Sequence, residues 1–126
     1  MRVLITAVLV LAGCAPSAPV ENPSRDFVSA VAGRVAGEKR GCVPTIGRSG
    51  LMPIDTRTIA VDNGSILWVS HLPAECPGLR PLATLIVERT GSQYCRGDLF
   101  RATEPGLSIP GPKCVLSEFT AYRKAR

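Results

Sequence analysis

The first regular pattern of apolar positions in the body of the chain begins after residue 23. Its apolar members recur at nearly helical spacing: Phe27, Val28, Val31 and Val35. Ser24 is a suitable N-cap, and Asp26 lies in the first turn, where the helix dipole favours a negative charge. Gly33 and Gly37 each weaken a helix interior by about 1 kcal/mol. The pattern predicts one short helix over residues 26–37.

From Gly41 the helical period disappears, and turn signals recur about every eight to twelve residues. Residues 57–61 are rich in β-branched side chains and end at Asp62-Asn63-Gly64, which contains the Asn-Gly pair typical of tight hairpins. Residues 65–70 form the next apolar run. The two runs therefore predict an antiparallel hairpin.

Further short strands follow at regular spacing. They are expected at 82–88 and 93–95, which would pair across a turn at 89–92, at 98–103, and at 114–122 after a Gly- and Pro-rich loop over 104–113. Pro73, Pro77 and Pro81 argue against a central strand around Cys76, so this region is predicted to be a stapled loop. The fold class is mainly β: a small antiparallel barrel or sandwich with one short N-terminal helix.

The N-terminus carries a different apolar pattern. Arg2 precedes an apolar run of about ten residues, which is too short to cross a ~30 Å hydrocarbon core and is typical of a signal peptide. The following Leu11-Ala12-Gly13-Cys14 resembles the lipobox of bacterial lipoproteins. This resemblance implies cleavage before Cys14 and acylation of its thiol. The alternative is ordinary secretory cleavage near Ala15.

These signals divide the chain into three parts. Residues 1–13 are predicted to be the lipoprotein signal peptide, 14–23 the acylated Cys14 with a flexible, proline-containing tether, and 24–126 the folded domain. Ala15, rather than Asp, follows Cys14. By the same resemblance, the periplasmic face of the outer membrane is favoured over that of the inner membrane.

The charge balance changes this picture little. The formal net charge is +5, but the basic residues are spread mostly singly and form no cluster typical of polyanion binding. Nucleic acid is disfavoured by the expected compartment and by the small aromatic content of one Trp, two Tyr and three Phe. The expected partners are the membrane, through the lipid anchor, and an envelope protein or glycan.

Four cysteines remain once Cys14 is set aside: Cys42, Cys76, Cys95 and Cys114. An even number in an oxidising compartment predicts two disulfides, with three pairings open. We favour Cys76 with Cys95, which would clasp one strand pair, and Cys42 with Cys114, which would join the start of the domain to its last strand. A zinc site is disfavoured because no C-x-x-C pair is present.

Several short motifs occur in a characteristic order. They are Gly41-Cys42-Val43-Pro44, Asp55-Thr56-Arg57-Thr58-Ile59, Leu72-Pro73-Ala74-Glu75-Cys76-Pro77-Gly78-Leu79, Tyr94-Cys95-Arg96-Gly97-Asp98 and Cys114-Val115-Leu116-Ser117-Glu118-Phe119. Over about residues 41–120 this order resembles a family of small exported proteobacterial proteins classed as a domain of unknown function. The resemblance implies a compact four-cysteine β-rich domain, and it implies no activity.

His71 is the one histidine and the first candidate for chemistry. A triad of Ser70 and His71 with Asp55 or Asp98 can be composed from the sequence, but triads are recognised by geometry. The chain contains no Gly-x-Ser-x-Gly nucleophile motif. We therefore expect His71 to be a satisfied or exposed side chain, and no catalytic residue is assigned.

Two further residues are candidates for binding. Asp98 follows Cys95 by three positions, so its carboxylate is expected to accept backbone N–H bonds in a turn, with a ligand-pocket role as the alternative. Trp68 is a core residue or, if it lies on an outer face, a binding anchor, and the local alternation does not decide between these.

The sequence contains no motif for a metal or cofactor, and we interpret Asp62-Asn63-Gly64 as a turn rather than a calcium loop. The favoured function is a lipid-anchored periplasmic lipoprotein that acts as a non-catalytic binding or interaction module. The alternatives are a small envelope hydrolase that uses His71 with a nearby acid, and a purely structural or inhibitory lipoprotein.

Overall fold

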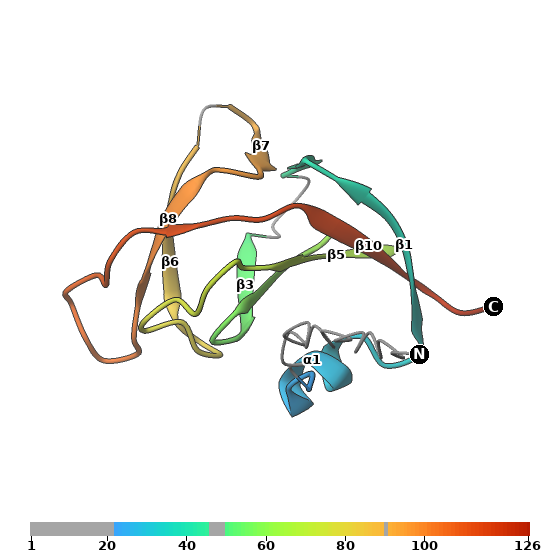
Figure 1. Cartoon of the computed structure of the whole chain (residues 1–126), viewed down its shortest axis with the longest axis horizontal. Coiled ribbons are helices and arrows are strands. Elements are labelled where there is room, and N and C mark those ends of the chain that lie inside the picture. The colour runs from blue at the N-terminus through green and yellow to red at the C-terminus, as the bar shows by residue number, and fades with distance from the viewer. Residues whose placement is uncertain (1–21, 46–49, 90) are drawn as a thin grey trace, which may run out of the picture.

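A computed structural model describes residues 22–45, 50–89 and 91–126 (Figure 1). Within these ranges the chain forms one helix and ten strands. In chain order they are α1 (Arg25–Ala30), β1 (Arg34–Arg40), β2 (Cys42–Pro44), β3 (Leu51–Asp55), β4 (Thr58–Asp62), β5 (Ile66–His71), β6 (Thr84–Glu88), β7 (Gln93–Cys95), β8 (Leu99–Thr103), β9 (Cys114–Val115) and β10 (Phe119–Lys124).

The predicted fold class is confirmed, because the protein is mainly β with antiparallel pairing and a single short helix near the N-terminus. The strands form a five-stranded sheet in the order β1-β10-β5-β4-β3, a three-stranded sheet in the order β6-β8-β9, and a two-stranded ladder of β2 and β7. Figure 1 shows β6 and β8 at one end of the molecule, β1 at the other, and α1 below the long sheet, against which it packs.

The main core lies on one face of the five-stranded sheet. Its buried members come from all three sheets, from the loop after β5 and from the segment between β9 and β10: Val43, Ile59, Val61, Trp68, Leu72, Cys76, Leu79, Tyr94, Phe100, Ala102, Leu116, Phe119 and Ala121. On the other face, Ala60, Leu67 and Val69 pack against Phe27 and Val31 of the helical segment. Both faces of β4 and β5 are therefore covered, and this explains why these two strands are buried along nearly their whole length.

The predicted hairpin is confirmed as β4 and β5, with Ile59 opposite Ser70 and Val61 opposite Trp68. Gly64 adopts a φ of 80°, which an L side chain rarely tolerates. The Asp62 carboxylate accepts a hydrogen bond from the Gly64 N–H at 2.8 Å. Local turn chemistry therefore fixes this register.

The predicted helix is correct only in its first half. α1 ends at Ala30, Gly33 takes a φ of 70°, and the chain continues as β1 along the edge of the long sheet. Residues 34–40 pair with β10 instead of continuing the helix that the spacing of the valines predicted, and Val35 is left 60% exposed.

An ion pair connects β1 to β10. The Arg123 guanidinium of β10 binds the Glu38 carboxylate of β1 and lowers the pKa of Glu38 to about 2.

The predicted pairing of 82–88 with 93–95 is wrong. β6 pairs with β8, and β7 pairs with β2 instead. Long-range packing decides the partners: Val87 lies opposite Phe100, and Tyr94 opposite Val43. The predicted strand over 114–122 is interrupted, because the segment between β9 and β10 buries Leu116 in the core.

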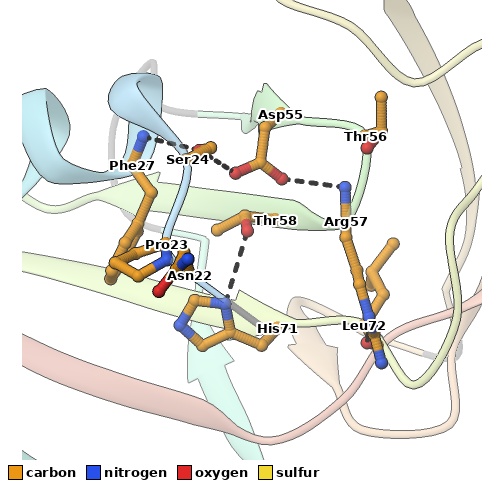
Figure 2. A pocket seen from close by; sticks show the side chains of 10 residues that line it. All are labelled: Asn22, Pro23, Ser24, Phe27, Asp55, Thr56, Arg57, Thr58, His71 and Leu72. Carbon is orange, nitrogen blue, oxygen red and sulfur yellow. Dashed lines mark hydrogen bonds between the residues drawn. The ribbon is translucent and has the colours of Figure 1, made fainter. Parts of the chain in front are cut away.

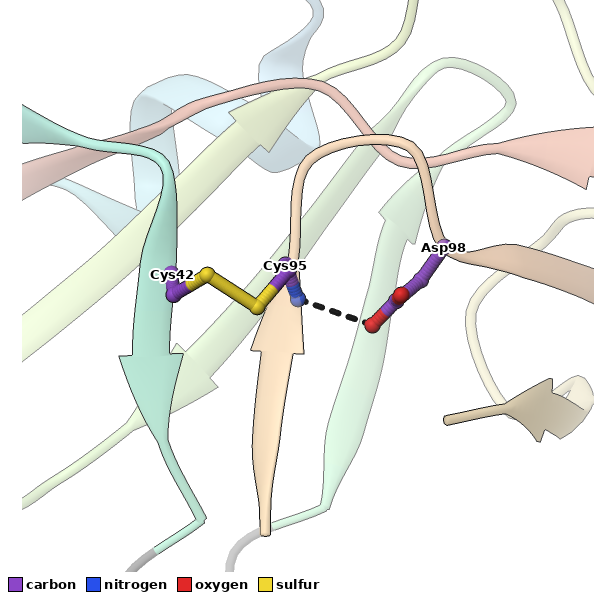
Figure 3. Close-up of a disulfide and its surroundings, with 3 residues drawn as sticks. All are labelled: Cys42, Cys95 and Asp98. Atoms are coloured by element: carbon purple, nitrogen blue, oxygen red, sulfur yellow. Dashed lines mark hydrogen bonds between the residues drawn. A yellow bond between two sulfur atoms is a disulfide. The ribbon is translucent and has the colours of Figure 1, made fainter. Parts of the chain in front are cut away.

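The two predicted disulfides are present, but the favoured pairing is wrong. Cys42 bonds to Cys95 and Cys76 bonds to Cys114. Cys42 and Cys95 lie directly opposite each other in the β2–β7 ladder, with Cα atoms 4.0 Å apart (Figure 3). That ladder was not predicted, and it removes Cys95 as a partner for Cys76. The region around Cys76 is a stapled loop as predicted.

Among the described residues, no helix has the length and apolarity needed to span a membrane. Cys14 and the predicted signal peptide lie outside the described residues.

Candidate functional site

A cleft of about 420 Å³ lies where α1 meets one end of the long sheet (Figure 2). Three parts of the chain line it: the segment that leads into α1, the β3–β4 turn, and the end of β5. Phe27 and Leu72 provide apolar surface, whereas Asp55, Arg57 and His71 provide polar groups. A concave site with an apolar wall and a few converging polar groups is typical of ligand binding.

Asp55 fixes the start of the helix to the sheet. Its Oδ2 accepts a hydrogen bond from Ser24 Oγ at 2.5 Å, and its Oδ1 accepts one from the Arg57 N–H at 2.8 Å. Ser24 Oγ also accepts the Phe27 N–H at 3.1 Å, so the predicted N-cap is confirmed. The N-cap and the β3–β4 turn are therefore held by a single carboxylate.

His71 is the second polar group of the cleft. It lies opposite Thr58 in the β4–β5 ladder, and its Nδ1 is 3.3 Å from Thr58 Oγ1. The Phe27 ring contacts the imidazole in an edge-to-face arrangement, with ring centroids 4.8 Å apart. In Figure 2, Nε2 of His71 points away from Thr58. Nδ1 therefore has a hydrogen-bond partner in Thr58, whereas Nε2 points away from that partner.

The pKa of Asp55 and that of His71 are both lowered. Burial opposes ionisation of Asp55, but hydrogen bonds from Ser24, Arg57 and Thr58 and the nearby His71 hold its pKa below the usual 3.8. Burial lowers the pKa of His71 and outweighs the attraction of Asp55. At neutral pH the cleft thus pairs an ionised carboxylate with a neutral imidazole. Thr58 is also a hydrogen-bond partner of Asp55, and a hydroxyl that donates its proton to Asp55 can only accept from Nδ1–H of His71. In that tautomer Nε2 is a hydrogen-bond acceptor.

Arg57 joins the cleft to the loop after β5. Its Nε donates to the Leu72 carbonyl at 3.0 Å, and its Nη2 donates to the Pro73 carbonyl at 3.1 Å. The guanidinium thereby fixes the path of the chain immediately after His71. These two hydrogen bonds hold the backbone next to His71, and a fixed backbone keeps the imidazole in one position in the cleft.

The structure brings His71 and Asp55 into one cleft, but it does not assemble the triad considered from sequence. Ser70 is fully buried, and its hydroxyl donates to the Ser117 carbonyl at 3.0 Å. It belongs to the face of β5 that carries Trp68, whereas His71 belongs to the opposite face. The Ser24 hydroxyl is bound to Asp55. Neither serine is placed to attack a substrate held by His71.

The remaining predicted residues lie elsewhere. Asp98 Oδ2 accepts the Cys95 N–H at 2.8 Å, so the predicted turn role is confirmed (Figure 3). Trp68 is 2% exposed and belongs to the main core, so the alternative of an exposed anchor is wrong. Within the described ranges, no group of three or more His, Cys, Asp or Glu side chains is arranged to hold a metal ion.

Sequence reasoning missed the part of the cleft formed by Ser24, Phe27 and Thr58. The N-cap signal of Ser24 was visible, but nothing in the sequence indicates that its hydroxyl meets Asp55, since 31 positions separate the two. Comparisons with protein-family models, with curated proteins and with solved structures found no match to this chain. The resemblance to a four-cysteine family stays a prediction.

Proposed function

We propose that this protein is a lipid-anchored lipoprotein of the bacterial envelope, on the outer membrane, whose folded domain is a non-catalytic binding module. The cleft between α1 and the β3–β4 turn is its binding site. The observation that carries this proposal is the preorganised chain of polar groups from His71 through Thr58 and Asp55 to Ser24, next to the Phe27 ring.

The chemistry of the cleft supports binding over catalysis. The carboxylate of Asp55 already accepts hydrogen bonds from several donors of the protein, and burial favours the uncharged form of His71. A neutral imidazole with an acceptor Nε2, beside an aromatic ring, fits a ligand with an N–H or O–H donor and an apolar edge. Envelope glycans and exposed peptide segments both offer such groups.

The anchoring part of the proposal rests on the sequence. Leu11-Ala12-Gly13-Cys14 supplies the lipobox, and the described chain begins at Asn22, which lines the cleft. An extended chain from Cys14 to Asn22 reaches at most about 30 Å. An acylated Cys14 would therefore hold the cleft close to the membrane surface and present it to ligands in the envelope.

Acylation can be tested by labelling growing cells with a fatty acid that carries an alkyne group. The native protein should take up the label, and the Cys14→Ser variant should not. Ala15→Ser is the matched control, because it changes the neighbouring residue and keeps the thiol. Equal labelling of the native protein and of Cys14→Ser would refute anchoring at Cys14.

Binding in the cleft can be tested with the isotopically labelled mature chain and a panel of envelope glycan fragments and short peptides, by nuclear magnetic resonance. A ligand should shift the amide signals of residues 55–58 and 71–72. His71→Gln should weaken the interaction, whereas Asp62→Asn in the distant β4–β5 turn should not. Shifts confined to other surfaces would refute the assignment of this cleft.

A small hydrolase is the second candidate, because His71 and Asp55 both line the cleft and Thr58 is a hydrogen-bond partner of each. In that case the neutral imidazole would accept a proton from a water molecule that attacks the substrate. The two proposals differ in turnover. Hydrolysis of an ester or amide that is lost in His71→Gln would favour the enzyme, and saturable binding without product would favour the binding module.

A further inference from the structure

Two loops meet at the end of the β6–β8 sheet. The first covers residues 72–83 between β5 and β6, and the second covers residues 104–113 between β8 and β9. Cys76 of the first loop is bonded to Cys114, the first residue of β9 directly after the second loop, and the Arg80 guanidinium lies 3.1 Å from the Glu104 carboxylate. Figure 1 shows both loops at the end of the molecule far from β1.

These loops expose three large aliphatic side chains. Leu82 is 88% exposed, Ile109 is 82% exposed, and Leu107 is 59% exposed. Single exposed apolar residues are common and need no explanation. Here the two most exposed large apolar side chains of the described ranges belong to adjoining loops. An exposed apolar surface of this kind is typical of a site that contacts another protein or a membrane.

Local contacts fix the backbone of the two loops. Leu82 has a φ of 71°, the one non-glycine residue of the described chain with a positive φ, and this conformation is unfavourable for a bulky side chain. In the second loop, the Leu107 N–H donates to the Glu104 carbonyl at 3.1 Å, and Gly111 packs against the backbone of Pro77. The loops are therefore braced against each other with their apolar residues facing solvent.

The charges on the two loops balance. Glu75 and Arg80 belong to the first loop, and Glu104 and Lys113 belong to the second. A surface without excess negative charge is not repelled by the anionic headgroups of a bacterial membrane. Its apolar residues are aliphatic, whereas specific protein interfaces are typically anchored by Trp, Tyr and Arg.

We propose that these two loops insert Leu82, Leu107 and Ile109 into the bilayer that carries the Cys14 anchor, so that the domain contacts the membrane at a second point. This inference rests on the proposed anchoring. Asn22, where the described chain begins, lines the cleft together with Leu72, the first residue of the first loop. The first loop therefore begins at the cleft, which also contains the residue where the described chain starts.

The anchor makes weak insertion sufficient. A domain tethered to the bilayer has a high effective concentration at the membrane surface, so even shallow burial of three aliphatic side chains orients it. In that orientation the cleft, at which the first loop begins, would be held near the headgroups. Ligands would therefore be captured next to the membrane.

The experiment uses the mature chain, residues 14–126, without acyl groups. The other four cysteines are in disulfides, so Cys14 carries the one free thiol and can be coupled to a maleimide phospholipid. The vesicles contain phosphatidylethanolamine and phosphatidylglycerol with brominated acyl chains, which quench nearby tryptophan. Because the attachment is chemical, the result does not depend on whether cells acylate Cys14.

Ile109→Trp reports on the loops, and Val35→Trp on the distant edge strand β1 is the matched control, because Val35 is also exposed. The buried Trp68 gives a constant background, which the native chain measures. The tryptophan at position 109 should lose most of its emission and shift to shorter wavelength, while the control keeps its emission. Equal emission from the two variants, quenched or unquenched, would overturn the proposal.

Discussion

The carboxylate of Asp55 should contribute measurably to the stability of the fold, and Asp55→Asn is the sharpest perturbation. Hydrogen bonds to a charged group contribute about 1.5–3 kcal/mol each, and bonds between neutral groups about 0.5–1.5 kcal/mol. Asp55 accepts from both Ser24 and Arg57. Since Asp55 is only partly buried, solvent screens it, and we expect the free energy of unfolding to fall by about 1–2 kcal/mol at pH 7.

The stabilisation by the Asp55 carboxylate depends on pH. The pKa of Asp55 is lower in the folded state than its usual 3.8, so the stabilisation is present above that value and is lost as the pH falls through the folded-state pKa. Urea unfolding from pH 7 down to about pH 2 should therefore show the native protein and Asp55→Asn converging in acid.

Asp26→Asn is the matched control, because Asp26 lies in the first turn of α1, the helix that Asp55 contacts, and its effect through the helix dipole is a few tenths of a kcal/mol. A loss below about 0.5 kcal/mol for Asp55→Asn at pH 7, or a difference that does not change with pH, would contradict the role given to this carboxylate.

Two other predictions concern the packing of the domain. Peptide mapping without reduction should recover the links Cys42–Cys95 and Cys76–Cys114, and a Cys76–Cys95 peptide would refute the pairing. Replacing both Cys76 and Cys114 by Ala should cost about 4 kcal/mol in the chain-entropy model, since the link spans 38 residues. Gly111→Ala should cost about 1–3 kcal/mol in thermal unfolding, because a Cβ would lie 3.1 Å from the Pro77 carbonyl oxygen; Gly41→Ala, with open space around it, should be near neutral.

Local signals in the sequence predicted local structure well. The β4–β5 hairpin depends on Asn63-Gly64 and on two flanking β-branched runs, all within a few residues of one another. Partners far apart in sequence were not predictable in the same way. The β2–β7 ladder and the β6–β8 pair are selected by burial of Val43, Tyr94 and Phe100 in a common core, and no single segment encodes that outcome.

The disulfide error follows directly from this limit. Four cysteines allow three pairings, and the correct one depends on which strands are neighbours. The turn role of Asp98, in contrast, was predictable, because its bond to the Cys95 N–H closes over three residues. For the cleft, the sequence indicated the cap at Ser24 and the candidates His71 and Asp55, but not the helix packing that brings them together.

Because α1 forms one wall of the cleft, the site exists only while that short helix is docked. Six residues are too few for a helix to be stable by itself, so its position depends on the contact of Ser24 with Asp55 and of Phe27 with His71. Ligand binding and helix docking are therefore coupled. A ligand that binds only the assembled cleft stabilises the docked helix, and the docked helix raises the affinity for the ligand by the same free energy. Asp55→Asn should consequently weaken ligand binding even for a ligand that never touches the carboxylate, and hydrogen exchange in α1 should slow when the site is filled. Unchanged affinity in this variant would mean that the helix is held by its apolar contacts alone.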